Sequence, residues 1–226
     1  MNHIEDNWNR VCDQVAQAAE RNSRQAPEVT IVAVSKTRPV ADIEAALAAG
    51  VKDLGENRIQ EATEKLPGIE GGRWHLIGQL QRNKAGKAVD LFHCVQSVDN
   101  QRLAQALARR ADEADRSIDV LIQVNTSGMT HQAGIPPDAV EGLADEIATT
   151  SCLRLGGLMT IANQAEETEV RRCFQSLRRC RDQLSATRPS LDLSTLSMGM
   201  SGDFELAIEE GSTMVRVGTA IFGTRS

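Results

Sequence analysis

The chain has 226 residues, of which 41% are hydrophobic and 25% charged, which suits one larger globular domain or two small ones. Its net charge of −6 argues against nucleic-acid binding, which usually needs a basic face. No run of 18 apolar residues is present and the N-terminus is polar, so neither a transmembrane helix nor a signal peptide is expected. Five cysteines without a Cys-x-x-Cys pair indicate neither a disulfide framework nor a metal site, and they favour the reducing cytoplasm.

Short apolar runs alternate with amphipathic stretches along the chain. Apolar residues at helical spacing from Ile4 and Trp8 to Ala19 predict a helix before the first strand. The other signs of helices are an apolar face at 43–47, an N-cap at Asp99, a start near Asp138, and C-caps at Gly50 and Gly211. Eight runs are typical of buried parallel strands, at 29–34, 53–54, 73–76, 91–95, 118–124, 153–158, 193–196 and 214–217.

Alternating strands and helices imply a parallel sheet, and eight units favour a closed (β/α)8 barrel of the TIM type over an open sheet. Only the nine residues 218–226 follow the last predicted strand, too few for an eighth following helix. The N-terminal helix is therefore expected to complete the outer ring. No linker or repeat interrupts the pattern, so residues 1–226 are expected to form a single domain.

Functional residues of such barrels lie where the strands end, at their C-terminal edge. The candidates at those positions are Lys36, Glu56, Asn57, His75, Ser97, Asn125, Met159, Thr160, Ser197, Met198, Gly199, Ser201, Arg216, Gly218 and Thr219. His75 by itself is equally compatible with a structural histidine. No GxGxxG or Walker A motif supports nucleotide binding.

Two features of this set point to chemistry. Small residues near Ser201, together with Gly218 and Thr219, place backbone N–H groups after strands seven and eight, where this fold commonly binds phosphate. An ordinary N-cap and turn is the alternative interpretation. Lys36 ends the first apolar strand, and it is either a surface side chain or, near Arg216 at the barrel mouth, an amine that attacks an aldehyde.

Several motifs in a fixed order make the sequence recognisable. VAVSKT at 32–37, GEN at 55–57, WHLIG at 74–78, LSMGMS at 196–201 and VRVG at 215–218 resemble those of the YggS/PROSC family. These are the pyridoxal phosphate homeostasis proteins, related to the barrel domain of alanine racemase. The resemblance runs from about residue 29 to residue 223, and it implies a pyridoxal 5′-phosphate (PLP) site at the mouth of the barrel.

The resemblance also assigns roles to the candidates. It implies that Lys36 carries PLP as a Schiff base and that Arg216 donates to the pyridine nitrogen. It places the phosphate on Ser201 and on the backbone of Gly218 and Thr219. Three further residues match positions that line the family's pocket, namely Asn57, His75 and Ser197.

Four positions depart from the family pattern. In the loop 125–134, Met129 and Gln132 stand where an acidic residue and a lysine are usual. Gln79 stands where proline is common, and Arg58 where tyrosine is common. The anchor residues are intact, so the departures bear on the role of that loop.

Two functions are open, a PLP carrier and a racemase-like enzyme acting on amino acids. Alanine racemases use a tyrosine from a separate domain of the partner subunit as second base, whereas this chain contains no tyrosine. A permanently charged Arg216 also leaves the pyridine nitrogen unprotonated, which makes PLP a poorer electron sink. We therefore expect a non-catalytic, cytoplasmic, monomeric carrier that serves vitamin B6 and amino-acid balance, with PLP-dependent apoenzymes as candidate recipients. No catalytic residue, metal ligand, nucleic acid or membrane enters this expectation.

Overall fold

Eight parallel strands form the centre of the computed structural model, which describes residues 3–163 and 166–224. They pair in chain order, and β8 pairs with β1, so that the sheet closes into a barrel. The strands are β1 (Thr30–Val34), β2 (Asp53–Glu56), β3 (Arg73–Leu76), β4 (Cys94–Val98), β5 (Ile118–Gln123), β6 (Leu153–Met159), β7 (Thr195–Met200) and β8 (Met214–Val217). The predicted (β/α)8 barrel is confirmed.

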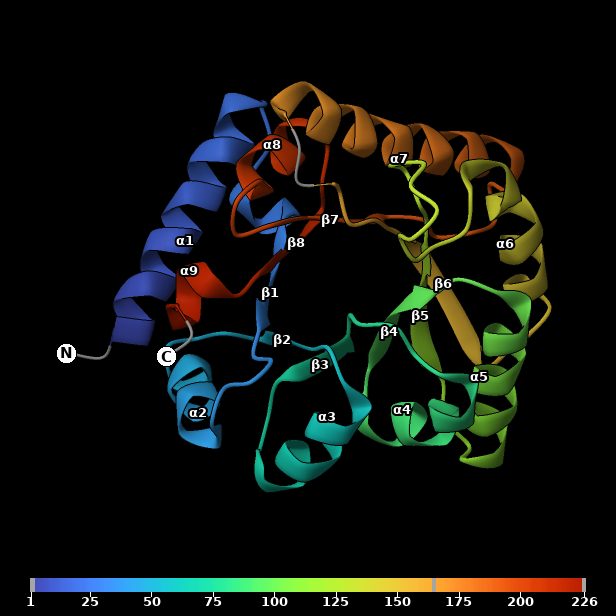
Figure 1. Ribbon diagram of the computed structural model, residues 1–226, viewed down its shortest axis with the longest axis horizontal. Helices are drawn as coiled ribbons and strands as arrows, with labels where there is room; N and C mark the ends of the chain where they lie inside the picture. Colours follow the sequence, from blue (N-terminus) through green and yellow to red (C-terminus); the bar gives the residue numbers. More distant parts are fainter. Residues whose placement is uncertain (1–2, 164–165, 225–226) are drawn as a thin grey trace.

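Helices surround the barrel in a ring (Figure 1). They are α1 (His3–Arg21), α2 (Val40–Ala48), α3 (Ile59–Lys65), α4 (Ala85–Leu91), α5 (Gln101–Glu113), α6 (Val140–Ala148), α7 (Glu167–Thr187), α8 (Phe204–Glu209) and α9 (Thr219–Phe222). The short α9 was not expected after the last strand. Because α9 has only four residues, the eighth place in the ring is still taken by α1, which packs against α2, α8 and α9.

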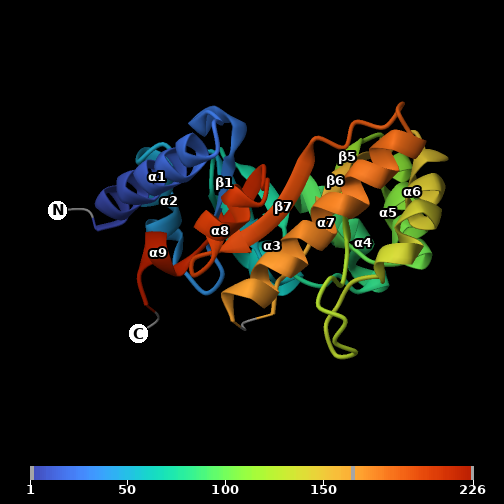
Figure 2. The same ribbon diagram turned by 90° about the horizontal axis from the view of Figure 1, so that it is seen from above.

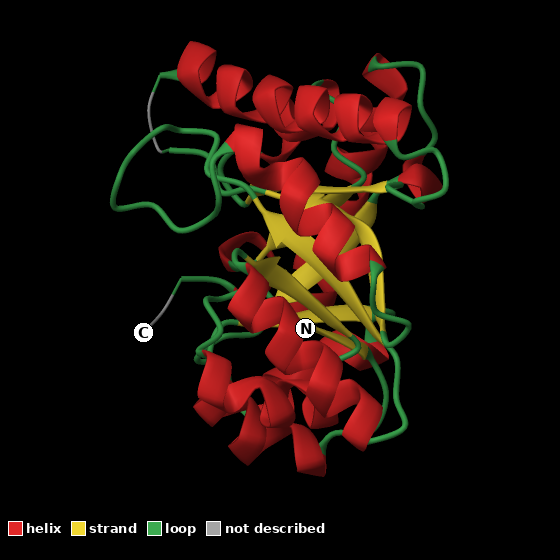
Figure 3. Ribbon diagram, turned by 90° about the vertical axis from the view of Figure 1, so that its right-hand side faces the viewer, coloured by secondary structure: helices red, strands yellow, loops and turns green. Residues whose placement is uncertain are grey.

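The N-terminal helix is held by its apolar face. Val11, Val15, Ala18 and Ala19 are buried beneath α1 at helical spacing. Asn7 on the same helix donates through Nδ2 to the backbone oxygen of Ile221 at 2.9 Å. Figure 2 shows α1 lying along one side of the barrel, and Figure 3 shows the strands with helices around them. In the described part of the chain, no helix is long and apolar enough to cross a membrane.

Two strands begin and end later in the chain than the apolar runs predicted. The run at 91–95 starts in the last residue of α4, and β4 covers Cys94–Val98. The run at 193–196 likewise gives way to β7 at Thr195–Met200. Gln96, Ser97 and Ser197 therefore lie within strands rather than after them, and all three are fully buried. The barrel tolerates such residues because their polar atoms have partners: Gln96 and Ser197 bond to each other, and Ser97 Oγ donates to the Gly78 carbonyl at 2.7 Å.

The cap of α5 is Asn100 rather than the predicted Asp99. Asn100 Oδ1 accepts a hydrogen bond from the backbone N of Leu103 at 2.9 Å, whereas Asp99 only accepts one from Asn100 Nδ2. The side chain one residue later reaches the third N–H of the helix. Gly50 and Gly211 follow α2 and α8 with φ of +97° and +99°, as predicted for C-caps.

Candidate functional site

A pocket of about 590 Å³ opens at the C-terminal ends of the strands, with residues from the ends of β1, β2, β7 and β8. Its volume is typical of a small-molecule site. The lining residues are Val34, Lys36, Asn57, Ile77, Ile161, Val170, Met200, Ser201, Gly202, Asp203, Arg216, Gly218 and Thr219. Six of the eight predicted site residues are among them, whereas His75 and Ser197 are not.

The backbone leading to Lys36 is fixed by buried polar contacts. The Ser35 N–H donates to the Gly55 carbonyl at 3.0 Å, and Ser35 Oγ donates to Glu56 Oε1 at 2.7 Å. Lys65 on α3 donates to the Ser35 carbonyl at 3.3 Å. Lys36 itself is half-buried and lines the pocket. These contacts determine where the Lys36 side chain leaves β1.

Glu56, the last residue of β2, is a buried carboxyl group that contacts Ser35 and Lys65. Its Oε1 lies 3.6 Å from Lys65 Nζ, and its Oε2 has no hydrogen-bond partner among the described residues. Burial raises the pKa of Glu56, an effect that the Ser35 hydrogen bond and the Lys65 charge oppose. The folded protein therefore keeps this proton to a higher pH than the unfolded chain does.

Arg216 is the buried cation of the pocket, with 3% of its surface exposed. Its two terminal nitrogens donate to Ser197 Oγ at 2.7 Å and to the Thr160 carbonyl at 2.8 Å. Burial lowers the pKa of Arg216 to about 10, and the nearby Asp203 carboxylate acts against that shift. The guanidinium therefore stays charged at neutral pH, and it can donate to a ligand but cannot accept from one.

His75 and Ser197 belong to a hydrogen-bond chain beneath the pocket. Arg216 donates to Ser197, and Ser197 Oγ donates to Gln96 Oε1 at 2.6 Å. Gln96 Nε2 then donates to His75 Nδ1 at 3.0 Å, which leaves His75 Nε2–H to donate to Asp53 Oδ1 at 2.9 Å. Every group in this chain has a partner, so it holds Arg216 in one orientation.

Gln96 and Asp53 are the members of this chain that the sequence analysis missed. A signal was present for Gln96, because a glutamine stands between Val95 and Ser97 in an apolar stretch. Such a polar residue in a buried strand must find a partner across the barrel. Nothing local marked Asp53 as the partner of a histidine 22 positions later.

The opposite side of the pocket is built from small residues and backbone donors. Ser201 Oγ accepts hydrogen bonds from the N–H of Gly218 at 3.1 Å and of Ala220 at 3.5 Å. A Cβ atom at Gly218 would lie only 3.3 Å from the Val34 carbonyl oxygen. A hydroxyl and the first N–H groups of α9 are thereby gathered in one place, a donor set that suits an anionic group.

The loop that departs from the family pattern is tied to the pocket wall. Asn125 Nδ2 donates to the carbonyls of Met129 at 2.8 Å and Gln132 at 3.1 Å, which closes the loop on itself. Gln132 Nε2 in turn donates to the carbonyl of Ile161, a pocket residue. Gln132 thus has a structural contact at the position where lysine is usual.

The fold and this pocket define a class of barrel, the alanine racemase N-terminal domain, whose family model matches residues 5–226. The Escherichia coli (strain K12) pyridoxal phosphate homeostasis protein is 40% identical over 233 residues, which cover 100% of this chain and 98% of that protein. The chain belongs to the family of pyridoxal phosphate homeostasis proteins, as the motifs indicated.

Solved structures agree with this assignment. PipY of Synechococcus elongatus, solved with PLP bound, is 39% identical with a TM-score of 0.82, over 92% of this chain and all of that one. An alanine racemase of Clostridium difficile has the same TM-score but is 15% identical, and this chain covers 57% of it. The second likeness shows the shared fold alone.

Proposed function

We propose that this protein binds PLP and acts as a carrier or regulatory protein in vitamin B6 homeostasis and amino-acid balance. The observation that carries the proposal is the placement of Lys36 and Arg216 in one pocket at the barrel mouth. Support comes from a relative named for PLP homeostasis and from a neighbour solved with PLP. PLP supplies an aldehyde that an amine can hold covalently and a phosphate ester that N–H and O–H groups can bind.

The residues present fit such a group. Lys36 would hold the aldehyde carbon as a Schiff base, and the buried, charged Arg216 would donate to the ring nitrogen. Ser201 and the backbone of Gly218 and Thr219 offer the donors that a phosphate requires. His75 and Ser197, which do not line the pocket, would act through Arg216, and Asn57 would contribute to the pocket wall.

A carrier is favoured over a racemase by the chemistry of this pocket. Arg216 keeps its proton at neutral pH, so the residue opposite the ring nitrogen withholds the proton that would strengthen carbanion stabilisation. The chain has no tyrosine to serve as the second base. The racemase likeness extends to the fold and does not restore either group.

We further propose that residues 1–226 form one PLP-binding domain, monomeric and cytoplasmic, with PLP-dependent apoenzymes as recipients. The barrel closes through its own eight strands and needs none from a second chain. Five cysteines without a Cys-x-x-Cys pair favour a reducing compartment.

Lys36 is tested by its own chemistry. Purified protein loaded with PLP should be yellow, and borohydride reduction followed by peptide mapping should find the pyridoxyl group on Lys36. Lys36→Ala should lose the absorption band, while the phosphate donors retain some cofactor without a covalent link. An adduct on Lys84 or Lys87, with Lys36 unmodified, would contradict the assignment.

A further inference from the structure

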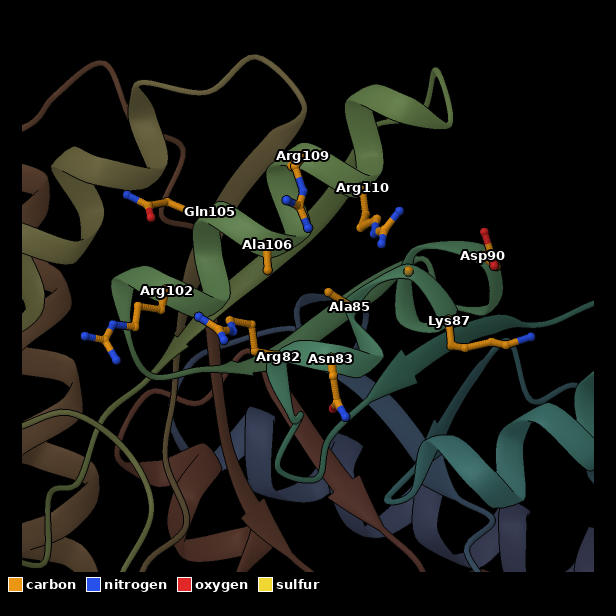
Figure 4. A pocket seen from close by; sticks show the side chains of 11 residues that line it. Arg82, Asn83, Ala85, Lys87, Asp90, Arg102, Gln105, Ala106, Arg109 and Arg110 are labelled. Atoms are coloured by element: carbon orange, nitrogen blue, oxygen red, sulfur yellow. The ribbon is translucent and has the colours of Figure 1, made fainter.

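A basic groove lies outside the PLP pocket, between α4 and α5 and the 3-10 turn Arg82–Lys84 that leads into α4 (Figure 4). Its volume is about 790 Å³. Small residues line part of the groove. Its five cationic side chains are Arg82, Lys87, Arg102, Arg109 and Arg110. Asp90 is the single acidic residue in the lining.

The positive charge in this groove is poorly neutralised. Among the described residues, Arg82, Lys87 and Arg102 form no ion pair, and Arg109 and Arg110 share the single carboxylate of Glu113 at 3.8 and 2.6 Å. By contrast, Arg171 on α7 alone contacts three glutamates. The whole chain carries a charge of −6, so the groove is a local positive field on an acidic protein.

The lining indicates what kind of ligand would fit. Its charged side chains are exposed, whereas a small-molecule site encloses its ligand and places a few fixed polar groups. No aromatic side chain lines the groove, so the stacking surface that single-stranded nucleic acids use is missing from it. Exposed cations along a groove are suited to steering and orienting an acidic protein surface.

A smaller depression lies between the groove and the PLP pocket. Asn57 lines that pocket and also a neighbouring depression of about 460 Å³, to which Arg58 and Lys84 contribute. Lys84 belongs to the same 3-10 turn as Arg82, which stands in the groove. A partner seated on the groove would therefore lie close to the PLP pocket.

We propose that this groove docks an acidic segment of a protein partner, and that the partner is the enzyme that receives the cofactor. The identity of the partner as a recipient rests on the proposed PLP-carrier function. The docking of an acidic segment rests on the charge, the exposure and the position of the groove. Docking there would hold the recipient's own site near the PLP pocket and raise the local concentration of the cofactor.

The test uses a fluorescein-labelled hexaglutamate peptide and PLP-loaded protein, with binding followed by fluorescence anisotropy at low salt. The groove variant is Arg82→Glu with Arg102→Glu. Its matched control is Lys52→Glu with Arg179→Glu, two exposed cations outside the groove that form no ion pair within the described residues. Both variants change the net charge equally. Peptide affinity should fall roughly tenfold or more in the groove variant and less than about twofold in the control.

Three results would overturn the docking site. Absence of peptide binding to the wild type, or equal weakening in both variants, would overturn the docking site. So would a hexathymidylate that binds more tightly than the peptide with the same dependence on Arg82 and Arg102, because the ligand would then be a nucleic acid. The yellow absorption band is read in every sample. Its absence from the wild type would overturn the PLP function instead, whatever the peptide does.

Discussion

Ser201 joins the two sides of the proposed phosphate site. Its hydroxyl accepts from the N–H groups of Gly218 and Ala220, so it organises the donors as well as being one. Gly218 has a φ of −113°, an angle open to any residue, so an unusual backbone conformation does not explain this glycine. The reason is space, because a Cβ there would approach Val34 closely. Gly218→Val should accordingly bind PLP more weakly than Ser201→Ala does.

The Ser201 assignment is tested with two ligands. Charge-assisted hydrogen bonds contribute roughly 1.5–3 kcal/mol, so Ser201→Ala should weaken PLP binding about ten- to a hundredfold. Pyridoxal, which lacks the phosphate, should bind the wild type far more weakly and respond little to the substitution. Titrating both ligands into both proteins measures the difference. If pyridoxal weakens as much as PLP, Ser201 acts on the fold rather than on the phosphate.

Glu56 makes stability depend on pH. Below its ordinary pKa of 4.5, the folded and unfolded states both hold the proton. As the pH rises, the unfolded chain releases its proton first because the folded pKa is raised, so the buried group progressively destabilises the fold. Glu56→Gln has no carboxyl group to ionise, so the variant does not lose stability in this way as the pH rises. The stability of the variant relative to wild type should therefore increase from about pH 4 to about pH 7.5.

Denaturant unfolding at the two pH values measures this effect, with exposed Glu44→Gln as the control. The control should show little change in relative stability between the two conditions. A relative stability of Glu56→Gln that falls with rising pH would mean that the ion pair with Lys65 outweighs desolvation.

At the scale of elements, helix ends decide small but measurable amounts of stability. Asn100→Ala removes the side-chain oxygen that accepts from the Leu103 N–H, so unfolding free energy should fall by about 1 kcal/mol. Asp99→Ala leaves that hydrogen bond in place and should cost less. Thermal or denaturant unfolding of both variants compares them directly. A larger loss in Asp99→Ala would return the cap to the position that the sequence analysis predicted.

Polar residues inside the barrel form hydrogen bonds between strands that are far apart in the sequence. Gln96 and Ser197 are 101 positions apart in the sequence. Their side chains lie 2.6 Å apart because β4 and β7 both direct them into the barrel interior. Their bond to each other supports Arg216 and not a ligand directly. Replacing either residue therefore acts on the orientation of Arg216 rather than on a contact with the pocket contents.

At the scale of the whole molecule, the pocket is expected to bind without turning over. With a charged Arg216 and no tyrosine, racemisation of L-alanine by PLP-loaded protein should stay near the rate of free PLP. Chiral chromatography of the product over time measures this rate, and Lys36→Ala is the control. Saturable turnover by the wild type that Lys36→Ala abolishes would replace the carrier by a racemase-like enzyme.

The barrel and the rim on which the candidate anchors lie follow from the local pattern of the sequence. Eight apolar runs separated by amphipathic stretches lead to a parallel barrel because each strand must bury both faces. Residues that follow those runs, such as Lys36, Asn57 and Gly218, then come together at one end of the barrel. Local pattern was sufficient here because strand direction alone puts these positions on the same rim.

Which polar residues line the pocket and which support it depends on contacts between residues far apart in the sequence. His75 is bonded to Asp53 and Gln96 on the two neighbouring strands, and Ser197 is bonded to Gln96 across the barrel. Glu56 meets Lys65 from a neighbouring helix. The ends of β4 and β7 were misplaced for the same reason. A polar side chain stays inside a strand when a residue far away in sequence satisfies it, and local hydrophobicity carries no information about that distant partner.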